Sequence, residues 1–208
     1  MAQDLFSGSA NPIATNDTNW ALGSTSEGET LSDLRADGSG FCIQNNGFGS
    51  TSAFYTGTTE AAKSEIVIPQ NAFSSANAGD RVGVFCCGGT GTRGLSAEVR
   101  QTDLTAQVVN TVFVQSNTSF VTNISLAPTI DLAAGPMTMS VQRTSATNLR
   151  VIVNGTTYNA DTTGLDIASG TSGIRQIRNN SSATTMKIDS WTDGVVAAAD
   201  TVIAWTVA

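Results

Sequence analysis

Acidic side chains are the main candidates for chemistry in this sequence, because none of its 208 residues is histidine. A chain without histidine lacks the usual general base and the commonest metal ligand of proteins. Cleavage of a glycosidic bond would need two carboxylates about 5–9.5 Å apart in a cleft. The glutamates show no paired motif; they are Glu27, Glu29, Glu60, Glu65 and Glu98. We therefore predict no catalytic residues and a protein that is not an enzyme.

Two pairs of aspartates are the strongest candidates for a cation site. Asp161 and Asp166 flank a predicted loop, and Asp189 and Asp193 flank Trp191. Calcium needs about six or more oxygen ligands, whereas aspartates in turns commonly accept hydrogen bonds from nearby backbone. We expect turn-capping aspartates here, and we predict neither a metal site nor a cofactor.

The three cysteines, Cys42, Cys86 and Cys87, are expected to be free thiols. An odd count in a chain without a secretory signal argues against a disulfide framework. Neighbouring side chains on a strand point to opposite faces, so Cys86 and Cys87 are not expected to share a role. Buried packing is the default for such residues.

Trp20, Trp191 and Trp205 raise the alternative of sugar binding, since exposed aromatic faces stack on pyranose rings. Each lies among apolar neighbours in a strand-like stretch. We expect them to pack inside the protein. An exposed Trp or Tyr beside Asp and Asn would instead indicate a carbohydrate-binding module.

Alternation of polar and apolar residues predicts an all-β chain whose sheets bury one face. The strands expected from this pattern are Asp4–Phe6, Trp20–Gly23, Leu31–Ala36, Phe41–Gln44, Ser52–Tyr55, Glu65–Ile68, Val82–Cys87, Leu95–Gln101, Gln107–Gln115, Phe120–Leu126, Met137–Arg143, Leu149–Asn154, a return strand from Tyr158, Ile174–Arg178, Thr185–Trp191 and an apolar segment from Val195 to Val207. We predict a single-domain antiparallel two-sheet jelly-roll β-sandwich over residues 1–208, with a loop-rich N-terminal arm over about residues 1–19.

The same pattern assigns the core and the turns. Arg81 and Arg150 should face outward, and the residues expected to be buried are Val82, Val84, Val151, Val153 and Ile188. Asp37–Gly40 and the Asn154-Gly155 hairpin should need positive φ.

Charge and composition narrow the range of partners. The formal net charge is −7 and no cluster of Lys and Arg is present, so no nucleic-acid partner is predicted. The chain has neither an N-terminal secretory signal nor a run of about 18 apolar residues that would cross a membrane. Only 13% of residues are charged, and Ser, Thr, Asn and Gly take their place. Such a surface suits a protein packed against neighbours or held outside a cell.

The order of these features resembles the concanavalin A-like, or laminin-G-like, jelly-roll family. The elements that carry the resemblance are Asp4-Leu-Phe6 with Trp20, Arg81–Phe85 followed by Ser96–Arg100, Val153-Asn154-Gly155 with Tyr158, and Ile188-Asp189-Ser190-Trp191. Glucanases of this fold use a Glu-x-Asp-x-x-Glu strand, and no glutamate here is followed by aspartate two positions later. Legume-type lectins hold metals with carboxylates and histidine, and this chain has no histidine. The resemblance therefore implies the fold, and neither the catalytic site nor the metal site is carried over.

Three functions remain to be compared. The leading hypothesis is a non-enzymatic bacteriophage virion structural protein, a capsid decoration (cement) protein that stabilises the shell, since jelly rolls are much used in viral capsids. Its partners would be the major capsid protein or other virion proteins, on the outer surface of the capsid or tail after assembly in the host cytoplasm. The alternative is a carbohydrate-binding adhesin or tail-fibre module for host attachment, with a glycan as partner. A glycan-cleaving enzyme ranks last.

Self-association is expected, because closed symmetric oligomers are common and a surface poor in charge has little repulsion between copies. A trimer at a matching symmetry axis of the shell is the predicted state. The segments expected to contact neighbours are residues Met1 to Thr30 and the apolar tail Val195 to Ala208.

Overall fold

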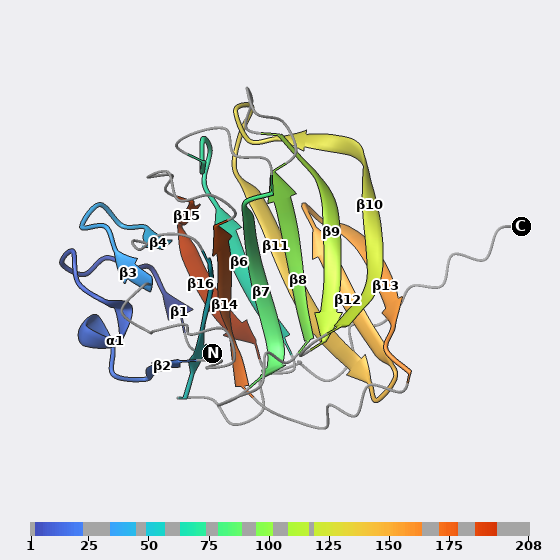
Figure 1. The fold of residues 1–208 in the computed structure, drawn as a ribbon, viewed down its shortest axis with the longest axis horizontal. Helices are drawn as coiled ribbons and strands as arrows, with labels where there is room; N and C mark the ends of the chain where they lie inside the picture. Colours follow the sequence, from blue (N-terminus) through green and yellow to red (C-terminus); the bar gives the residue numbers. More distant parts are fainter. Residues whose placement is uncertain are drawn as a thin grey trace, which may run out of the picture.

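Sixteen β-strands and one short helix form the described chain, which confirms the all-β prediction. The computed structural model describes residues 3–22, 34–44, 49–56, 63–73, 79–88, 95–101, 108–116, 119–163, 171–178 and 186–194. The strands form two large antiparallel sheets and a small third one. The large sheets lie face to face, as a jelly-roll sandwich requires (Figure 1).

The first sheet has six strands in the order β1-β16-β6-β11-β12-β13. Their bounds are Gln3–Asp4, Ser190–Gly194, Lys63–Ile68, Met137–Ser145, Asn148–Val153 and Thr156–Asp161. Polar and apolar residues alternate in β6 and β12, and their burial alternates in the same way. This sheet therefore has the register that the sequence predicts.

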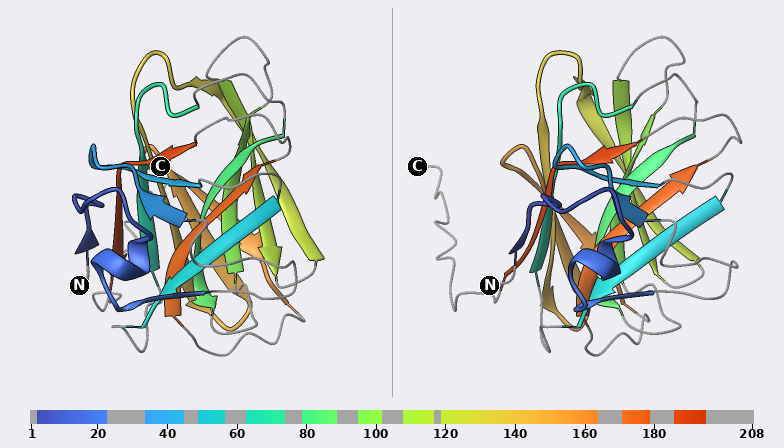
Figure 2. Two further views of the ribbon diagram at one scale, coloured as in Figure 1. Left: turned by 60° about the vertical axis from the view of Figure 1, so that its left-hand side comes forward. Right: turned by 90° about the vertical axis from the view of Figure 1, so that its left-hand side faces the viewer.

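The second sheet has seven strands in the order β10-β9-β8-β7-β14-β5-β2. Their bounds are Ser119–Asp131, Val108–Ser116, Leu95–Gln101, Arg81–Gly88, Thr171–Arg178, Gly49–Tyr55 and Trp20–Leu22. β6 and β11 of the first sheet pack against β7 of the second (Figure 2).

The third sheet has the order β15-β4-β3, with bounds Lys187–Ile188, Cys42–Gln44 and Leu34–Ala36. It lies with helix α1, Ile13–Asn16, at one end of the sandwich (Figure 1). The single strand expected over Thr185–Trp191 is instead two, β15 and β16, with Asp189 between them. The expected strand over Val195–Val207 lies outside the described residues. No helix in the described part of the chain is long and apolar enough to cross a membrane.

A continuous apolar core fills the space between the large sheets. Val82, Val84, Val151 and Ile188 are fully buried and Val153 is 3% exposed, as the alternation predicts. Each such side chain stabilises the fold by about 1.5–3 kcal/mol through removal from water. Trp20 and Trp191 also lie in this core, with ring centroids 4.9 Å apart. They are therefore packing residues and not exposed sugar platforms; Trp205 lies outside the described residues.

Both predicted turns have the expected backbone. Asn154 and Gly155 have φ of 47° and 80°, which is the two-residue hairpin turn whose twist matches that of the flanking strands. Gly38 and Gly40 have φ of 81° and 95°.

The described part of the loop-rich N-terminal segment packs against the rest of its own domain. β1 pairs with β16, and Phe6 and Ile13 are buried in the core. The Asp4 carboxylate also accepts a 2.6 Å hydrogen bond from Trp20 Nε1. This segment is ordered by its own domain, so a neighbouring subunit is not needed to hold it.

Candidate functional site

The outer face of the seven-stranded sheet, which points away from the core, carries a buried ion pair between Glu98 and Arg175. Directly paired residues share a face, so the register places Glu98 of β8, Gly83 of β7 and Arg175 of β14 in one row across three strands. The adjacent row holds Ser96 and Phe85. We call Ser96, Glu98, Arg81 and Arg175 the charged layer.

Glu98 is the centre of the charged layer. Its Oε1 accepts 2.8 Å and 3.0 Å hydrogen bonds from Arg175 Nη1 and Ser96 Oγ, and its Oε2 lies 3.7 Å from Arg81 Nη1. The side chains of Glu98 and Arg175 are only 1% and 3% exposed. A carboxylate so buried needs these partners, because an uncompensated buried charge is strongly destabilising.

Glycines on the central strands make room for this layer. A Cβ on Gly83 would lie 2.5 Å from Cγ of Glu98, and a Cβ on Gly173 would lie 2.5 Å from Cζ of Phe85. Glu98 and Phe85 therefore lie flat across neighbouring strands. A glycine in a strand interior often marks such a close approach.

Arginines outnumber carboxylates around Glu98. Arg81 is 20% exposed in its side chain, and its pKa is lowered by burial, which exceeds the opposing effect of Glu98. The positive charges of Arg100 and Arg175 lower it further. Glu98 is thus held as a counter-ion among arginines.

The central strands of the seven-stranded sheet place no second carboxylate beside Glu98. Among the residues of β5, β7, β8 and β14, Glu98 is the only acidic one. Hydrolysis of a glycosidic bond uses two carboxyl groups, one of which must hold a proton. Glu98 instead makes an ion pair with Arg175, and no second carboxylate lies on these four strands.

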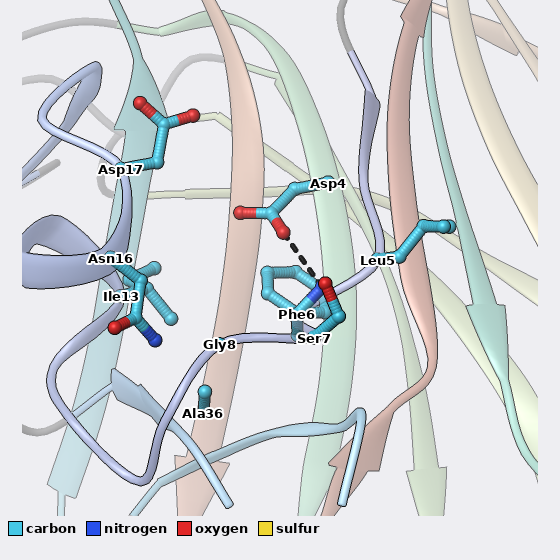
Figure 3. Close-up of a pocket in the computed structure, with 9 residues that line it drawn as sticks. All are labelled: Asp4, Leu5, Phe6, Ser7, Gly8, Ile13, Asn16, Asp17 and Ala36. Carbon is cyan, nitrogen blue, oxygen red and sulfur yellow. Dashed lines mark hydrogen bonds between the residues drawn. The ribbon is translucent and has the colours of Figure 1, made fainter. Parts of the chain in front are cut away.

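A pocket of about 380 Å³ lies at the N-terminal end of the sandwich. Figure 3 shows its lining, which comprises Asp4, Leu5, Phe6, Ser7, Gly8, Ile13, Asn16, Asp17 and Ala36. Leu5 is 54% exposed. The pocket thus combines carboxylate and amide groups with an exposed apolar side chain.

The two pocket carboxylates also hold local structure. Asp4 accepts a 2.7 Å hydrogen bond from the backbone N–H of Phe6 (Figure 3). Asp17 accepts hydrogen bonds from the Asn19 backbone and from the Tyr55 hydroxyl, at 2.9 Å and 2.8 Å. Burial of Tyr55 and its hydrogen bond to Asp17 raise the pKa of the phenol.

The aspartates considered as cation ligands lie in different environments. Asp161 caps a turn, accepting hydrogen bonds from Thr163 N and Oγ1 at 2.9 Å and 2.6 Å, and these lower its pKa. Asp193 is instead buried within β16, so the turn-capping expectation is wrong for it. Asp166 lies outside the described residues. Within the described ranges, no group of three Cys, Asp or Glu side chains is placed to hold a metal ion.

The two neighbouring cysteines differ from the arrangement expected from the sequence. Cys42, Cys86 and Cys87 are buried and free. Cys86 and Cys87, however, do not point to opposite faces, because both belong to the core cluster and their thiols share a hydrogen bond. Strand alternation alone missed this pair.

Comparison with known proteins shows the fold. No family model and no curated protein matches the chain. A lichenase from a mouse hindgut metagenome has a TM-score of 0.56 at 11% identity, over 91% of this chain and 96% of that one. The β-glucanase of Bacillus licheniformis has a TM-score of 0.53 at 11% identity, over 88% and 97%. The carbohydrate recognition domain of Emp46p has a TM-score of 0.50 at 13% identity, over 94% and 100%.

The chain thus has the same jelly-roll β-sandwich fold as these structures, which is the fold that the sequence resemblance implied. At these identities the likeness concerns the fold and not the activity.

Proposed function

We propose that this chain is a non-catalytic structural protein of a bacteriophage virion, a decoration protein on the capsid surface. The observation that supports the non-catalytic part is the ion pair of Glu98 with Arg175 at 2.8 Å. This ion pair engages the carboxylate of Glu98, which would otherwise be free on the sheet face for acid–base catalysis. The assembly part is supported by the low charge of the chain, with 13% of residues charged.

Strand β13 is the surface through which copies or shell proteins would contact this chain. It is the last strand of the six-stranded sheet (Figure 1). Thr156, Thr157 and Asn159 are exposed on it. Monomeric proteins commonly protect such edges with lysine or proline, and β13 contains neither.

Binding to intact shells tests the proposal. Purified protein mixed with capsids that lack it should co-sediment and saturate at a ratio set by a symmetry axis of the shell. Sedimentation of the protein alone should show a closed oligomer, with a trimer as the proposed state. Thr157→Lys should weaken both, because it adds charge to the edge strand. Thr192→Lys, on β16 in the same sheet, is the matched control and should leave both intact.

Enzyme assays test the non-catalytic part separately. The protein should hydrolyse no β-glucan, whether wild type or Glu98→Gln. Hydrolysis of a β-glucan by the wild-type protein would overturn this part of the proposal.

Glycan recognition is the second candidate function, and the pocket beside Asp4, Asn16 and Asp17 favours it. Amide and carboxylate groups are suitable partners for sugar hydroxyls, and Leu5 offers an apolar contact beside them. A glycan array should then give a hit that Leu5→Ala and Asn16→Ala weaken and Thr192→Ala does not. An array without any hit would reject this candidate and leave the assembly role unaffected.

A further inference from the structure

Cys86 and Cys87 lie at an irregularity of β7 that brings their thiols together. Between the pairs Phe85–Gly173 and Gly88–Thr171, β7 advances by three residues while β14 advances by two. The extra residue is a β-bulge, and Cys87 has φ of 57°. Left-handed backbone is uncommon for a residue with a side chain. The bulge therefore replaces strand alternation with a pair of adjacent thiols on the core side.

The facing sheet supplies a cation to this pair. Arg143 of β11 donates a side-chain hydrogen bond to Cys87, and its backbone N–H donates to Cys86. The hydrogen bond from Cys86 and the Arg143 charge and hydrogen bond together lower the pKa of Cys87 to about 7, although burial opposes them. The pKa of Cys86 is raised, by its hydrogen bond to Cys87 and by burial. Cys87 is thus suited to act as the nucleophile of the pair, and Cys86 is its hydrogen-bonded neighbour.

Cys87 and Cys86 also differ in their exposure to solvent. Cys87 is 7% exposed, whereas Cys86 and Cys42 are fully buried. Burial and the charges of Asp4 and Asp37 hold the pKa of Cys42 well above its usual range. Cys42 is therefore an internal control that should remain reduced.

We infer that Cys86 and Cys87 form a reversible redox pair, which a hydroperoxide converts into a vicinal disulfide. The Cys87 thiolate attacks one peroxide oxygen, the O–O bond breaks, and the departing oxygen takes a proton and leaves as water or an alcohol. The resulting Cys87 sulfenic acid is attacked at sulfur by Cys86, and the hydroxyl group leaves with the Cys86 proton as water. Two thiols are oxidised, one peroxide is reduced, and an S–S bond forms. The inference does not depend on the proposed role in assembly.

Neighbouring Cα atoms are about 3.8 Å apart, which is shorter than the usual span of a disulfide of about 4.4–6.8 Å. The bond between adjacent cysteines is therefore strained and easily reduced, which is the property of labile disulfides. A mild dithiol should restore both thiols.

Thiol counting and peptide mapping of the full chain test the inference. The native protein is treated with hydrogen peroxide under conditions that oxidise the urea-denatured protein. The count of free thiols should fall from three to one, and dithiothreitol should restore it to three. The peptide that contains both cysteines should lose the mass of two hydrogen atoms. Cys42→Ser should fall from two free thiols to none, and Cys87→Ser should keep both of its thiols.

The arginine is tested by a matched pair of variants. Arg143→Met should slow the loss of thiols several-fold, and Lys63→Met, which removes a cation from the same sheet, should not. Three thiols after peroxide, a sulfinic acid on Cys87 beside a free Cys86, or a dimer linked through Cys42 would each overturn the inference. Mapping of the wild-type chain decides between these outcomes even if a variant fails to fold.

Discussion

The two large sheets of this sandwich bury their faces in different ways. In the six-stranded sheet, β6 and β12 alternate between buried and partly exposed residues, so one face packs and the other meets solvent. In the seven-stranded sheet, five consecutive residues of β8, Leu95 to Val99, are all buried. The inner face of that sheet is mostly apolar, whereas its outer face holds the charged layer. One sheet follows the simple rule for antiparallel sheets, whereas strands β5, β7, β8 and β14 of the other are buried on both sides.

The difference shows what each face depends on. An aliphatic face is stabilised by removal from water and tolerates changes that keep volume. A buried charged face depends on complete pairing, because each group left without its partner carries the full cost of desolvation. The outer face of the seven-stranded sheet should therefore respond to single polar substitutions as strongly as a core does.

The largest effect is expected from breaking the ion pair of the charged layer. Glu98→Gln leaves Arg175 buried without its counter-charge, since these side chains are 1% and 3% exposed. Loss of one partner of a buried pair costs about 3–5 kcal/mol in the free energy of unfolding. Urea denaturation followed by tryptophan fluorescence measures it, because Trp20 and Trp191 are buried.

The double variant Glu98→Leu with Arg175→Met separates pairing from charge. It removes both charges together, so it should recover most of the stability lost by Glu98→Gln. A double variant no more stable than the single one would mean that the layer is held by something other than the pair.

A smaller loss is expected from Gly83→Ala. The new Cβ would lie 2.5 Å from Cγ of Glu98 and 2.9 Å from the carbonyl oxygen of Ala97. Overpacking of this kind costs about 1–3 kcal/mol. Gly135→Ala is the matched control, since nothing lies within 4 Å of its Cβ. Equal thermal midpoints for the two variants would show that Glu98 does not lie across Gly83.

The contrast between the sheets also explains what could be predicted from the sequence. Strand positions, the Asn154-Gly155 hairpin and the apolar core depend on local alternation and turn chemistry. These predictions were confirmed for most strands of the described chain, but not for Thr185–Trp191, which is two strands. Glu98 and Arg175 are 77 positions apart in the sequence, so their ion pair has no local signal. Polar residues at alternate positions of a strand also look like residues that face solvent. The usable signal was Gly83 in a strand interior, which marks a close approach of a neighbouring group.

The bulge at Cys86 and Cys87 escaped prediction for another reason. Alternation assumes a regular strand, and an extra residue in β7 turns both side chains to the same side. The turn residues of the N-terminal segment likewise gave no indication that Phe6 and Ile13 are buried in the core, where they are 2% and 1% exposed.

A still smaller effect is expected at the hairpin of the six-stranded sheet. Gly155 has φ of 80°, and no atom lies within 4 Å of its Cβ position. Gly155→Ala therefore meets no steric neighbour and is opposed only by its backbone, at about 1 kcal/mol. Thermal denaturation should show a modest drop, and Gly155→Asn should recover part of it because asparagine tolerates this conformation. An unchanged melting temperature for Gly155→Ala would mean that the turn can relax to another type.

The smallest effect is expected from the ion pair on the open face of the six-stranded sheet. Lys63 Nζ and Glu65 Oε2 are 3.9 Å apart, and both side chains are 38% exposed. Water already solvates both groups, so the pair contributes only about 0–1 kcal/mol and is screened by salt. Glu65→Gln should therefore leave the denaturation midpoint nearly unchanged, while the same substitution at Glu98 lowers it strongly. If the two substitutions cost the same, the outer face of the seven-stranded sheet is as open to water as that of its partner, and the distinction between the sheets fails.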